Sequence, residues 1–234
     1  MRRCAMLHLY RIEEKINPLM KKAYRAVFAP PLPDLRGDRD VEYSFVAANM
    51  PDGPGRAIDF GSGPSWMGLL AARKGFTVTS LDLGEMSWFY SHPRLNFLCE
   101  DIFKSNFPAE HFDLIINCSA IEHVGLRGRY GVTEERPDGD IEAMGILRIA
   151  LKRSGTMLLT IPVGRDSVFS PLHRVYGLSR LLRLLDGYNV LRKEFWVKDD
   201  QNKWIGADES VVLDKQPVIH CYGLGLFVLR PAAR

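Results

Sequence analysis

The sequence contains few cysteines, and none of them lie close together. The four are Cys4, Cys99, Cys118 and Cys221. Disulfide frameworks and zinc sites place cysteines at short, repeated spacings, so we exclude a disulfide-rich scaffold and a zinc site. Cys99 and Cys118 lie in apolar runs, and we expect them to be buried as small residues.

Long apolar runs and long basic blocks are also missing. No window approaches the roughly 20 apolar residues that a membrane span needs. Charged residues such as Arg11 and Glu13 interrupt the first helical pattern, so we expect no secretion signal. The formal net charge is only +3. We therefore expect a cytoplasmic protein with neither a membrane partner nor a nucleic-acid partner.

What remains is the composition of a globular protein. The chain has 234 residues, of which 46% are hydrophobic and 25% are charged, which suits one domain with a full core. Predicted helices cover residues 5–28 (one or two helices), 40–49, 65–74, 140–152 and 178–186. Predicted strands cover residues 57–60, 77–81, 95–99, 112–118, 156–162, 190–197, 203–205 and 218–229. Alternating strands and helices predict an α/β fold with a mostly parallel sheet covered on both faces.

Two connections in this pattern lead to specific expectations. Only about a dozen residues separate Asp82 from the strand at 95–99, so we expect a short helical turn instead of a full helix. A long polar loop over residues 124–140 precedes the helix at 140–152, and Asp140 is expected to cap that helix.

The most informative segment is Arg56–Leu70, which contains a short strand, a glycine turn and a helix. Gly61 and Gly63 have no side chain, so the backbone can turn tightly and approach a ligand. The helix that follows aims its free N–H groups at that ligand. The next strand ends in Asp82, whose carboxylate can bind both hydroxyls of a ribose. These features predict a nucleoside-binding half-sheet.

Three features favour S-adenosyl-L-methionine (SAM) over a dinucleotide. Asp59 precedes the turn, where a dinucleotide fold has an apolar residue, and an acid there can attract the ammonium group of SAM directly or through water. Trp66 stands in place of the third glycine of the dinucleotide fingerprint. Three successive strands end in acids at regular intervals, and these acids are Asp59, Asp82 and Asp101. Asp101 suits the amino group of adenine, and Ile102 suits its ring face.

In these features the chain resembles the class I SAM-dependent methyltransferases. The matching segments are Ile58–Gly63, Ser80–Asp82, Cys99–Ile102, Phe112–Val124 and Leu151–Pro162. The resemblance implies a Rossmann-like, doubly wound sheet with N-terminal helices in a single methyltransferase domain over residues 1–234. Within it, residues 1–50 would form a helical cap, 55–163 the SAM-binding core, and 164–234 the C-terminal part of the sheet and the acceptor side. One departure is Ser65, where many members have a third glycine.

A narrower resemblance points to an uncharacterised branch of this superfamily, known as a domain of unknown function. It is carried by Glu122–Leu126, Gly128–Gly131, Asp138–Asp140, Ile161–Asp166 and His173–Gly177. This resemblance supports the fold and supplies no substrate.

The expected cofactor is SAM, and the residues expected to bind it follow the strand ends. They are Asp59, Gly61, Ser62, Gly63, Asp82, Leu83, Asp101, Ile102 and Ser119.

Catalysis of methyl transfer to a hydroxyl requires a positioned acceptor and a group that removes its proton. Glu122 and His123 follow the strand at 112–118, and His173 follows the strand at 156–162. We expect these three residues to be catalytic, with His123 as a general base oriented by a carboxylate. Packing or substrate contact is the alternative role for both histidines.

A divalent metal is a further alternative. Some ubiquinone-pathway and small-RNA methyltransferases hold a cation with Glu-x-x-Glu-His after the same strand. Glu122 and His123 match its second half, whereas Ser119 occupies the place of the first glutamate. Because serine is a poor ligand, we expect no metal.

The predicted function is methyl transfer from SAM to a small molecule, with an oxygen on a sugar or another polar metabolite as the favoured acceptor. The alternatives are a non-catalytic SAM-binding or regulatory module and a nicotinamide-dependent oxidoreductase. Three arginines, Arg127, Arg129 and Arg136, lie in the long loop. An anion-binding lid and a solvated loop explain them equally well.

Overall fold

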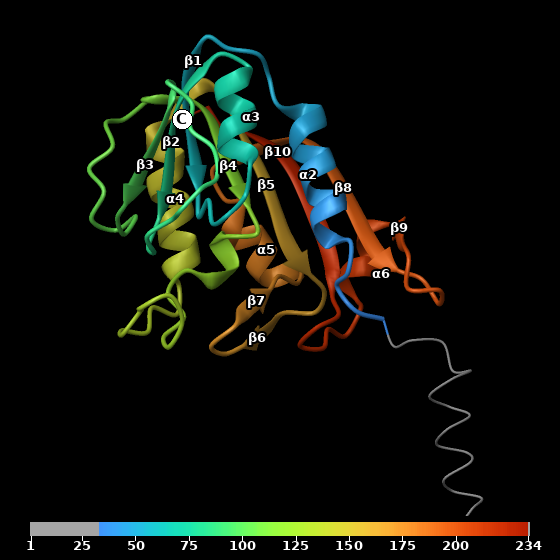
Figure 1. Ribbon diagram of the computed structural model, residues 1–234. Coiled ribbons are helices and arrows are strands. Elements are labelled where there is room, and N and C mark those ends of the chain that lie inside the picture. Colours follow the sequence, from blue (N-terminus) through green and yellow to red (C-terminus); the bar gives the residue numbers. More distant parts are fainter. Residues whose placement is uncertain (1–32, 234) are drawn as a thin grey trace, which may run out of the picture.

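The structure is a computed structural model that describes residues 33–233, and the helices expected within residues 5–28 lie outside this range. An eight-stranded sheet forms its centre, in the order β3-β2-β1-β4-β5-β10-β8-β9 (Figure 1). The strands are β1 (Gly55–Phe60), β2 (Phe76–Asp82), β3 (Leu95–Cys99), β4 (Phe112–Cys118), β5 (Leu151–Val163), β8 (Tyr188–Lys198), β9 (Trp204–Gly206) and β10 (Gly223–Pro231). A separate two-stranded sheet pairs β6 (Ser167–Phe169) with β7 (His173–Val175).

The strand directions divide the sheet into two parts. Strands β1 to β5 run parallel to one another. Strand β10 lies antiparallel between β5 and β8, and β8 forms the expected hairpin with β9. The parallel strands therefore end at one edge of the sheet. In Figure 1 their arrowheads point toward the end of the molecule that carries β6 and β7.

Helices cover both faces of this sheet, as the alternation of strands and helices predicts. They are α2 (Asp38–Asn49), α3 (Met67–Arg73), α4 (Gly139–Ala150), α5 (Leu178–Leu184) and α6 (Glu209–Leu213), with a 3₁₀ turn η1 at Ile121–His123. Helices α2 and α3 pack on one face, where Ala57 and Leu158 are buried. Helices α4 and α5 pack on the other face against Ile58 and Leu159. Neighbouring strand residues thus point to opposite faces, and both faces are apolar.

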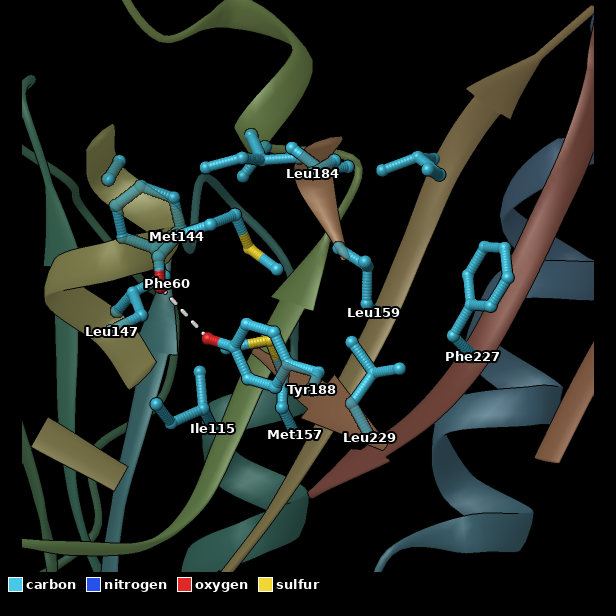
Figure 2. Close-up of a cluster of buried hydrophobic side chains, with 14 of the residues drawn as sticks. Phe60, Ile115, Met144, Leu147, Met157, Leu159, Leu184, Tyr188, Phe227 and Leu229 are labelled. Carbon is cyan, nitrogen blue, oxygen red and sulfur yellow. Dashed lines mark hydrogen bonds between the residues drawn. The ribbon is translucent and has the colours of Figure 1, made fainter. Parts of the chain in front are cut away.

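The larger core lies between the sheet and helices α4 and α5 (Figure 2). Met144 and Leu147 of α4 meet Phe60, Ile115 and Met157 of the sheet in this cluster. Tyr188 enters the same core, and its buried hydroxyl donates a 2.9 Å hydrogen bond to the carbonyl of Met144. The phenol therefore keeps its hydrogen bond inside an apolar core, as a buried tyrosine requires.

Several predicted boundaries are confirmed and others are wrong. The strands at 95–99 and 112–118 have the predicted bounds. The helix expected at 140–152 ends at Ala150, because β5 begins immediately at Leu151. The helical turn expected after Asp82 is wrong, since residues 83–94 contain no helix. Strands β6 and β7 and helix α6 are too short to leave a periodic pattern and were not predicted.

The expectation for Cys99 is also wrong. Its side chain is exposed because β3 is the edge strand of the sheet. Cys118, on the central strand β4, is only partly exposed. An apolar run alone does not distinguish an edge strand from a central one.

Asp140 does not cap α4 as expected, because no side chain caps that helix. Its carboxylate is fully buried in the first turn. It accepts a 3.0 Å hydrogen bond from the Tyr176 hydroxyl and a 2.9 Å hydrogen bond from Nε of Arg180. Arg174 lies 3.8 Å away and donates to the carbonyls of Val124 and Pro137. This buried network connects α4 and α5 to the long loop.

In the part of the chain that the structure describes, none of the helices combines the length and the apolar character needed to cross a membrane.

Replacing Asp140 with asparagine should destabilise the fold by about 3 kcal/mol, because it leaves buried guanidinium charge without its counter-charge. Asp214→Asn is the matched control, since Asp214 is exposed and pairs with the exposed Arg165 outside this network. That variant should cost less than about 1 kcal/mol. Urea unfolding of both variants measures the difference, and equal losses would contradict a special role for the buried network.

Candidate active site

The predicted cofactor residues lie at or after the carboxyl ends of β1, β2, β3 and β4, and the candidate catalytic residues lie in η1 after β4 and in β7 after β5. Gly61 and Gly63 both have positive φ angles, of 63° and 49°. A Cβ added to Gly61 would lie 2.3 Å from the Cβ of Ala120, whereas one added to Gly63 would meet no atom of residues 33–233 within 4 Å. The first glycine therefore permits close contact with the segment after β4. The second leaves open space over the turn.

Asp82 faces the glycine turn from the end of β2. Its Oδ2 accepts a 2.9 Å hydrogen bond from the Gly63 N–H, and its Oδ1 accepts a 3.2 Å hydrogen bond from the Gly84 N–H. The carboxylate is only partly buried, and each oxygen keeps further acceptor capacity. Its role as the acid that binds the ribose stays a prediction.

Asp59 lies deeper than the turn. It is 2% exposed, and its Oδ2 accepts a 2.9 Å hydrogen bond from the Gly68 N–H in α3. Burial raises the pKa of Asp59 to about 7, with a smaller contribution from the charge of Asp82. Its visible role is to hold the helix that follows the turn, and contact with a ligand ammonium stays a prediction.

The remaining predicted cofactor residues occupy different environments. Asp101 accepts a 3.0 Å hydrogen bond from the Phe103 N–H, and Ile102 is buried beside it. Ser62 is buried, and among residues 33–233 its hydroxyl has no hydrogen-bond partner. Leu83 is 41% exposed. An exposed leucine and an unpartnered buried hydroxyl at one edge of the sheet leave room for a ligand contact.

The segment after Asp82 is attached to the turn by aromatic side chains. Trp88 donates through Nε1 to the carbonyl of Gly63 at 3.2 Å, and the Tyr90 hydroxyl donates to the carbonyl of Ser65 at 2.6 Å. The two rings stack with their centroids 5.5 Å apart. These contacts hold residues 83–94 against the turn without a helix. Phe89 between them is fully exposed.

A buried acid beside the site, Glu42, was not predicted from the sequence. Glu42 of α2 accepts hydrogen bonds from the hydroxyls of Ser119 and Thr160 and pairs with Arg39, whose Nη1 lies 2.5 Å from its Oε2. Burial raises the pKa of Glu42, and the charge of Arg39 opposes that shift. Glu42 shares the buried stripe of α2 with Phe45 and Val46, so its helical spacing was the signal that could have identified it.

Ser119 is therefore fixed from two sides. It has a φ angle of 48°, its N–H donates to the carbonyl of Thr160 at 3.0 Å, and its hydroxyl donates to Glu42. A positive φ is uncommon for serine, so this backbone is held by its surroundings.

Glu122 and His123 lie side by side in η1. His123 bonds through Nδ1 to the carbonyl of Leu172 at 2.6 Å. Because a carbonyl only accepts, Nδ1 carries the hydrogen, and Nε2 of the neutral ring keeps its lone pair. That Nε2 lies 3.7 Å from Oε1 of Glu122. Oε2 of Glu122 is buried and has no partner within the described residues.

Burial sets the protonation of this pair. It raises the pKa of Glu122 to about 8 and lowers the pKa of His123 to about 4. Near neutral pH the carboxyl is therefore mostly protonated and the imidazole is unprotonated. Both groups are uncharged, which is the lower-energy state for a buried site.

His173 begins β7 and lies in an aromatic environment. Its ring centroid is 5.4 Å from that of Phe169 and 5.0 Å from that of Tyr222. The side chain is 6% exposed, and in the described region its Nε2 has no hydrogen-bond partner. Burial lowers its pKa to about 4, and the charge of Arg129 adds to the shift. His173 is thus a second neutral imidazole close to the first.

The three loop arginines have different environments in the structure. Arg127 is exposed, and Arg136 pairs with Glu142 at 3.4 Å. Arg129 alone reaches the candidate catalytic residues, because its Nη1 donates to the same Leu172 carbonyl that His123 contacts.

The structure offers no ligand set for the metal alternative. Across residues 33–233, no three His, Cys, Asp or Glu side chains are grouped so as to hold an ion. The hydroxyl of Ser119, at the place of the first glutamate, donates to Glu42.

A comparison with known protein families identifies the middle of the chain. The sequence profile of one family, described as Caenorhabditis protein of unknown function, DUF268, matches residues 92–216, more than half of the chain. The chain belongs to this family. The matched part of this DUF268 protein contains Glu122, His123 and His173, whereas the glycine turn precedes it. The expected membership of an uncharacterised branch is confirmed. No curated protein sequence matches the chain.

Solved structures confirm the Rossmann-like class I methyltransferase fold. The 1,6-didemethyltoxoflavin-N1-methyltransferase of Burkholderia thailandensis is 12% identical, covers 97% of this chain and 90% of its own, and has a TM-score of 0.54. A SAM-dependent methyltransferase of Mesorhizobium loti is 16% identical, covers 82% and 99%, and has a TM-score of 0.55. The [4+2]-cyclase SpnF is 14% identical, covers 96% of both chains and has a TM-score of 0.58. At these identities the likeness extends to the fold alone.

Replacing Glu122 with glutamine should change how stability depends on pH. The folded-state pKa of about 8 lies above the ordinary value of 4.5, so the stability contributed by the protonated form is lost as pH rises toward and through 8. Glutamine stays neutral and lacks this loss. The stability of the variant relative to the native protein should therefore increase from pH 5 to pH 9, by more than about 1.4 kcal/mol.

Urea unfolding at both pH values measures this difference. Glu134→Gln is the control, because it changes an exposed carboxylate in the adjoining loop and should give no such trend. A pH-independent difference for Glu122→Gln would show that Glu122 is ionised in the folded protein.

Proposed function

We propose that this protein is a SAM-dependent methyltransferase that methylates an oxygen of a small, polar acceptor. The observation that carries the proposal is the open space above Gly63, bordered by the carboxylate of Asp82. Both lie at the carboxyl edge of a sheet with the class I methyltransferase fold.

The residues at this edge fit SAM. Asp82 would bind the ribose hydroxyls with its spare acceptor capacity, and Asp101 would accept from the adenine amino group. Ile102 would pack on the adenine ring. The buried hydroxyl of Ser62, which has no hydrogen-bond partner among the described residues, would contact SAM. The N–H groups of Gly61, Gly63 and Gly68 already donate to Leu81, Asp82 and Asp59, so the expectation that this turn and helix aim free N–H groups at the ligand is wrong for them.

When bound, SAM would supply its methyl group: an acceptor oxygen bonds to the methyl carbon as the carbon–sulfur bond breaks, and the electron pair remains on the sulfur of S-adenosylhomocysteine. The oxygen then carries an excess proton, which a protein group must take. Nε2 of His123 is suited to this task, because its lone pair is kept free by the Nδ1–H bond to Leu172.

A weak base is sufficient for this step. An alkylated oxygen that still carries its proton is strongly acidic, so a histidine with a pKa of about 4 can accept that proton. The lowered pKa also keeps the ring unprotonated throughout the neutral range. Glu122, uncharged beside it, would hydrogen-bond the acceptor through the oxygen that has no partner within residues 33–233.

The acceptor is proposed to be a small molecule, and the location is proposed to be cytoplasmic. The weak net charge of +3 supports the absence of a nucleic-acid partner. The structural neighbours include an N-methyltransferase and a cyclase, so the fold leaves the acceptor atom and even the reaction open. The proposal of an oxygen acceptor is supported by the two neutral imidazoles at the site, those of His123 and His173.

Replacing Asp82 with alanine should weaken SAM binding at least tenfold, or about 1.4 kcal/mol, because the ribose loses its acceptor. Glu85→Ala is the matched control, since it removes an exposed acid from the same segment and should leave the affinity unchanged. Calorimetry with SAM, S-adenosylhomocysteine and NAD tests the assignment. Tight binding of NAD without binding of SAM would overturn it.

Replacing His123 with glutamine should lower kcat at least 100-fold and leave SAM affinity within twofold, because a general base acts on the chemical step. Release of S-adenosylhomocysteine from a library of hydroxylated small molecules provides the assay. His111→Gln, which changes a histidine at the opposite end of β4, is the control.

The outcomes of this assay separate the candidate roles. A loss of activity in His173→Gln but not in His123→Gln would assign the base to His173 instead. Intact SAM binding with no turnover across the library would contradict catalysis and favour a SAM-binding module.

A further inference from the structure

Arg129 lies beside the candidate catalytic residues. Its Nη1 donates a 3.0 Å hydrogen bond to the carbonyl of Leu172, and its guanidinium lies 4.6 Å from the centroid of the Tyr130 ring. The same carbonyl accepts from His123, whose ring packs edge-on against Tyr130 at 5.6 Å. Arg129 is thus held beside the catalytic candidate by two independent contacts.

In the part of the chain that the structure describes, no carboxylate neutralises the charge of Arg129. Other arginines near the site have carboxylate partners: Arg39 pairs with Glu42, and Arg136 pairs with Glu142. Within residues 33–233, Arg129 makes its hydrogen bond to a carbonyl and forms no ion pair. The nearby Glu122 does not supply the missing charge, since burial raises its pKa to about 8.

Two further groups at this place are without partners in the described chain. They are Oε2 of Glu122, on a side chain that is 3% exposed, and Nε2 of His173, on a residue that is 6% exposed. Buried polar atoms usually have a hydrogen-bond partner, so two in one region indicate a missing ligand. Tyr130, Phe169 and Tyr222 add aromatic surface around these groups.

We propose that Arg129 binds an anionic group, a carboxylate or a phosphate, on the methyl acceptor, while Glu122 and His173 contact its polar body. This inference rests on the proposed function and specifies the substrate class of the same site. The planar guanidinium presents several N–H donors in a fork that matches both anions, and its contact with Leu172 leaves donors free for them. The anion would hold the acceptor in a fixed orientation relative to His123.

A binding experiment tests this directly on the full chain saturated with S-adenosylhomocysteine. The ring ¹⁵N and ¹H resonances of His123 and His173 are followed during titration with glucuronate, benzoate and inorganic phosphate, with glucose as the uncharged counterpart of glucuronate. At least one anion should shift both histidines saturably, and glucose should not. Arg129→Gln should weaken the response at least tenfold, or about 1.4 kcal/mol.

Arg127→Gln is the matched control, because it removes the same charge two residues away from an exposed position. It should keep the response of the native protein, while both variants keep their thermal unfolding midpoint. The proposal is overturned if no anion gives a saturable shift, if glucose binds as well as glucuronate, or if Arg129→Gln retains the native response.

Turnover distinguishes the two anion sources. Release of S-adenosylhomocysteine is compared for pairs of acceptors that differ only in the anion: sugars with their uronic acids, sugars with their phosphates, and hydroxybenzamides with hydroxybenzoates. The acid or the phosphate should have the lower KM in its pair, and Arg129→Gln should raise that KM at least tenfold. Equal KM values within every pair would overturn the proposal.

The failure of this inference can be distinguished from the failure of the proposed function. Calorimetry with S-adenosylhomocysteine is performed first on each sample. Cofactor binding without anion binding would refute the role of Arg129 and leave the methyltransferase proposal intact. Anion binding to a chain that binds neither SAM nor S-adenosylhomocysteine would refute the proposed function instead.

Discussion

The close approach of Gly61 to Ala120 is the constraint that links the two halves of the candidate site. A side chain at position 61 would lie 2.3 Å from the Cβ of Ala120, so only glycine allows the two segments to meet. The positive φ angle of Gly61 reinforces this requirement. Ala120 immediately precedes η1, which carries Glu122 and His123. This one contact therefore sets the position of the glycine turn relative to that of the catalytic candidates.

Burial determines the chemistry on the acceptor side of that contact. The same low-dielectric surroundings raise the pKa of Glu122 and lower the pKa values of His123 and His173. Opposite shifts for acids and bases leave all three groups uncharged near neutral pH. Arg129 cannot lose its charge in this way, because a guanidinium stays protonated. The site thus combines three uncharged ionisable side chains with the cation of Arg129.

The sequence predicted those parts of the site that depend on local pattern. The glycine turn, Asp82 and Asp101 follow strands whose apolar runs and boundaries are clear, so their common edge follows from the parallel topology. Glu42 was missed because its partners Ser119 and Thr160 are far away in sequence. The helical spacing of α2 was sufficient to predict that Glu42 is buried. It was not sufficient to predict which groups form hydrogen bonds with its carboxylate.

The errors have a similar origin. Asp140 has the sequence context of a helix cap, yet tertiary contacts with Arg180 and Tyr176 draw its carboxylate into the interior. Cys99 has apolar neighbours, yet β3 is an edge strand, and edge position is a property of sheet order. In both cases the local sequence is compatible with more than one arrangement of the side chain. Packing between distant segments determines which arrangement forms.

The family match and the structural likeness inform different halves of the site. The DUF268 profile begins at residue 92, after the glycine turn and Asp82, and includes Glu122, Arg129 and His173. Family membership therefore concerns the part of the site that carries Glu122, Arg129 and His173, and the family description gives no chemistry for it. The neighbours share the fold that positions the turn, but their low identity carries no information on individual side chains. We consequently infer SAM binding from Gly63 and Asp82 themselves. The case for an anionic acceptor depends on a cation that the described part of the protein leaves without a counter-charge.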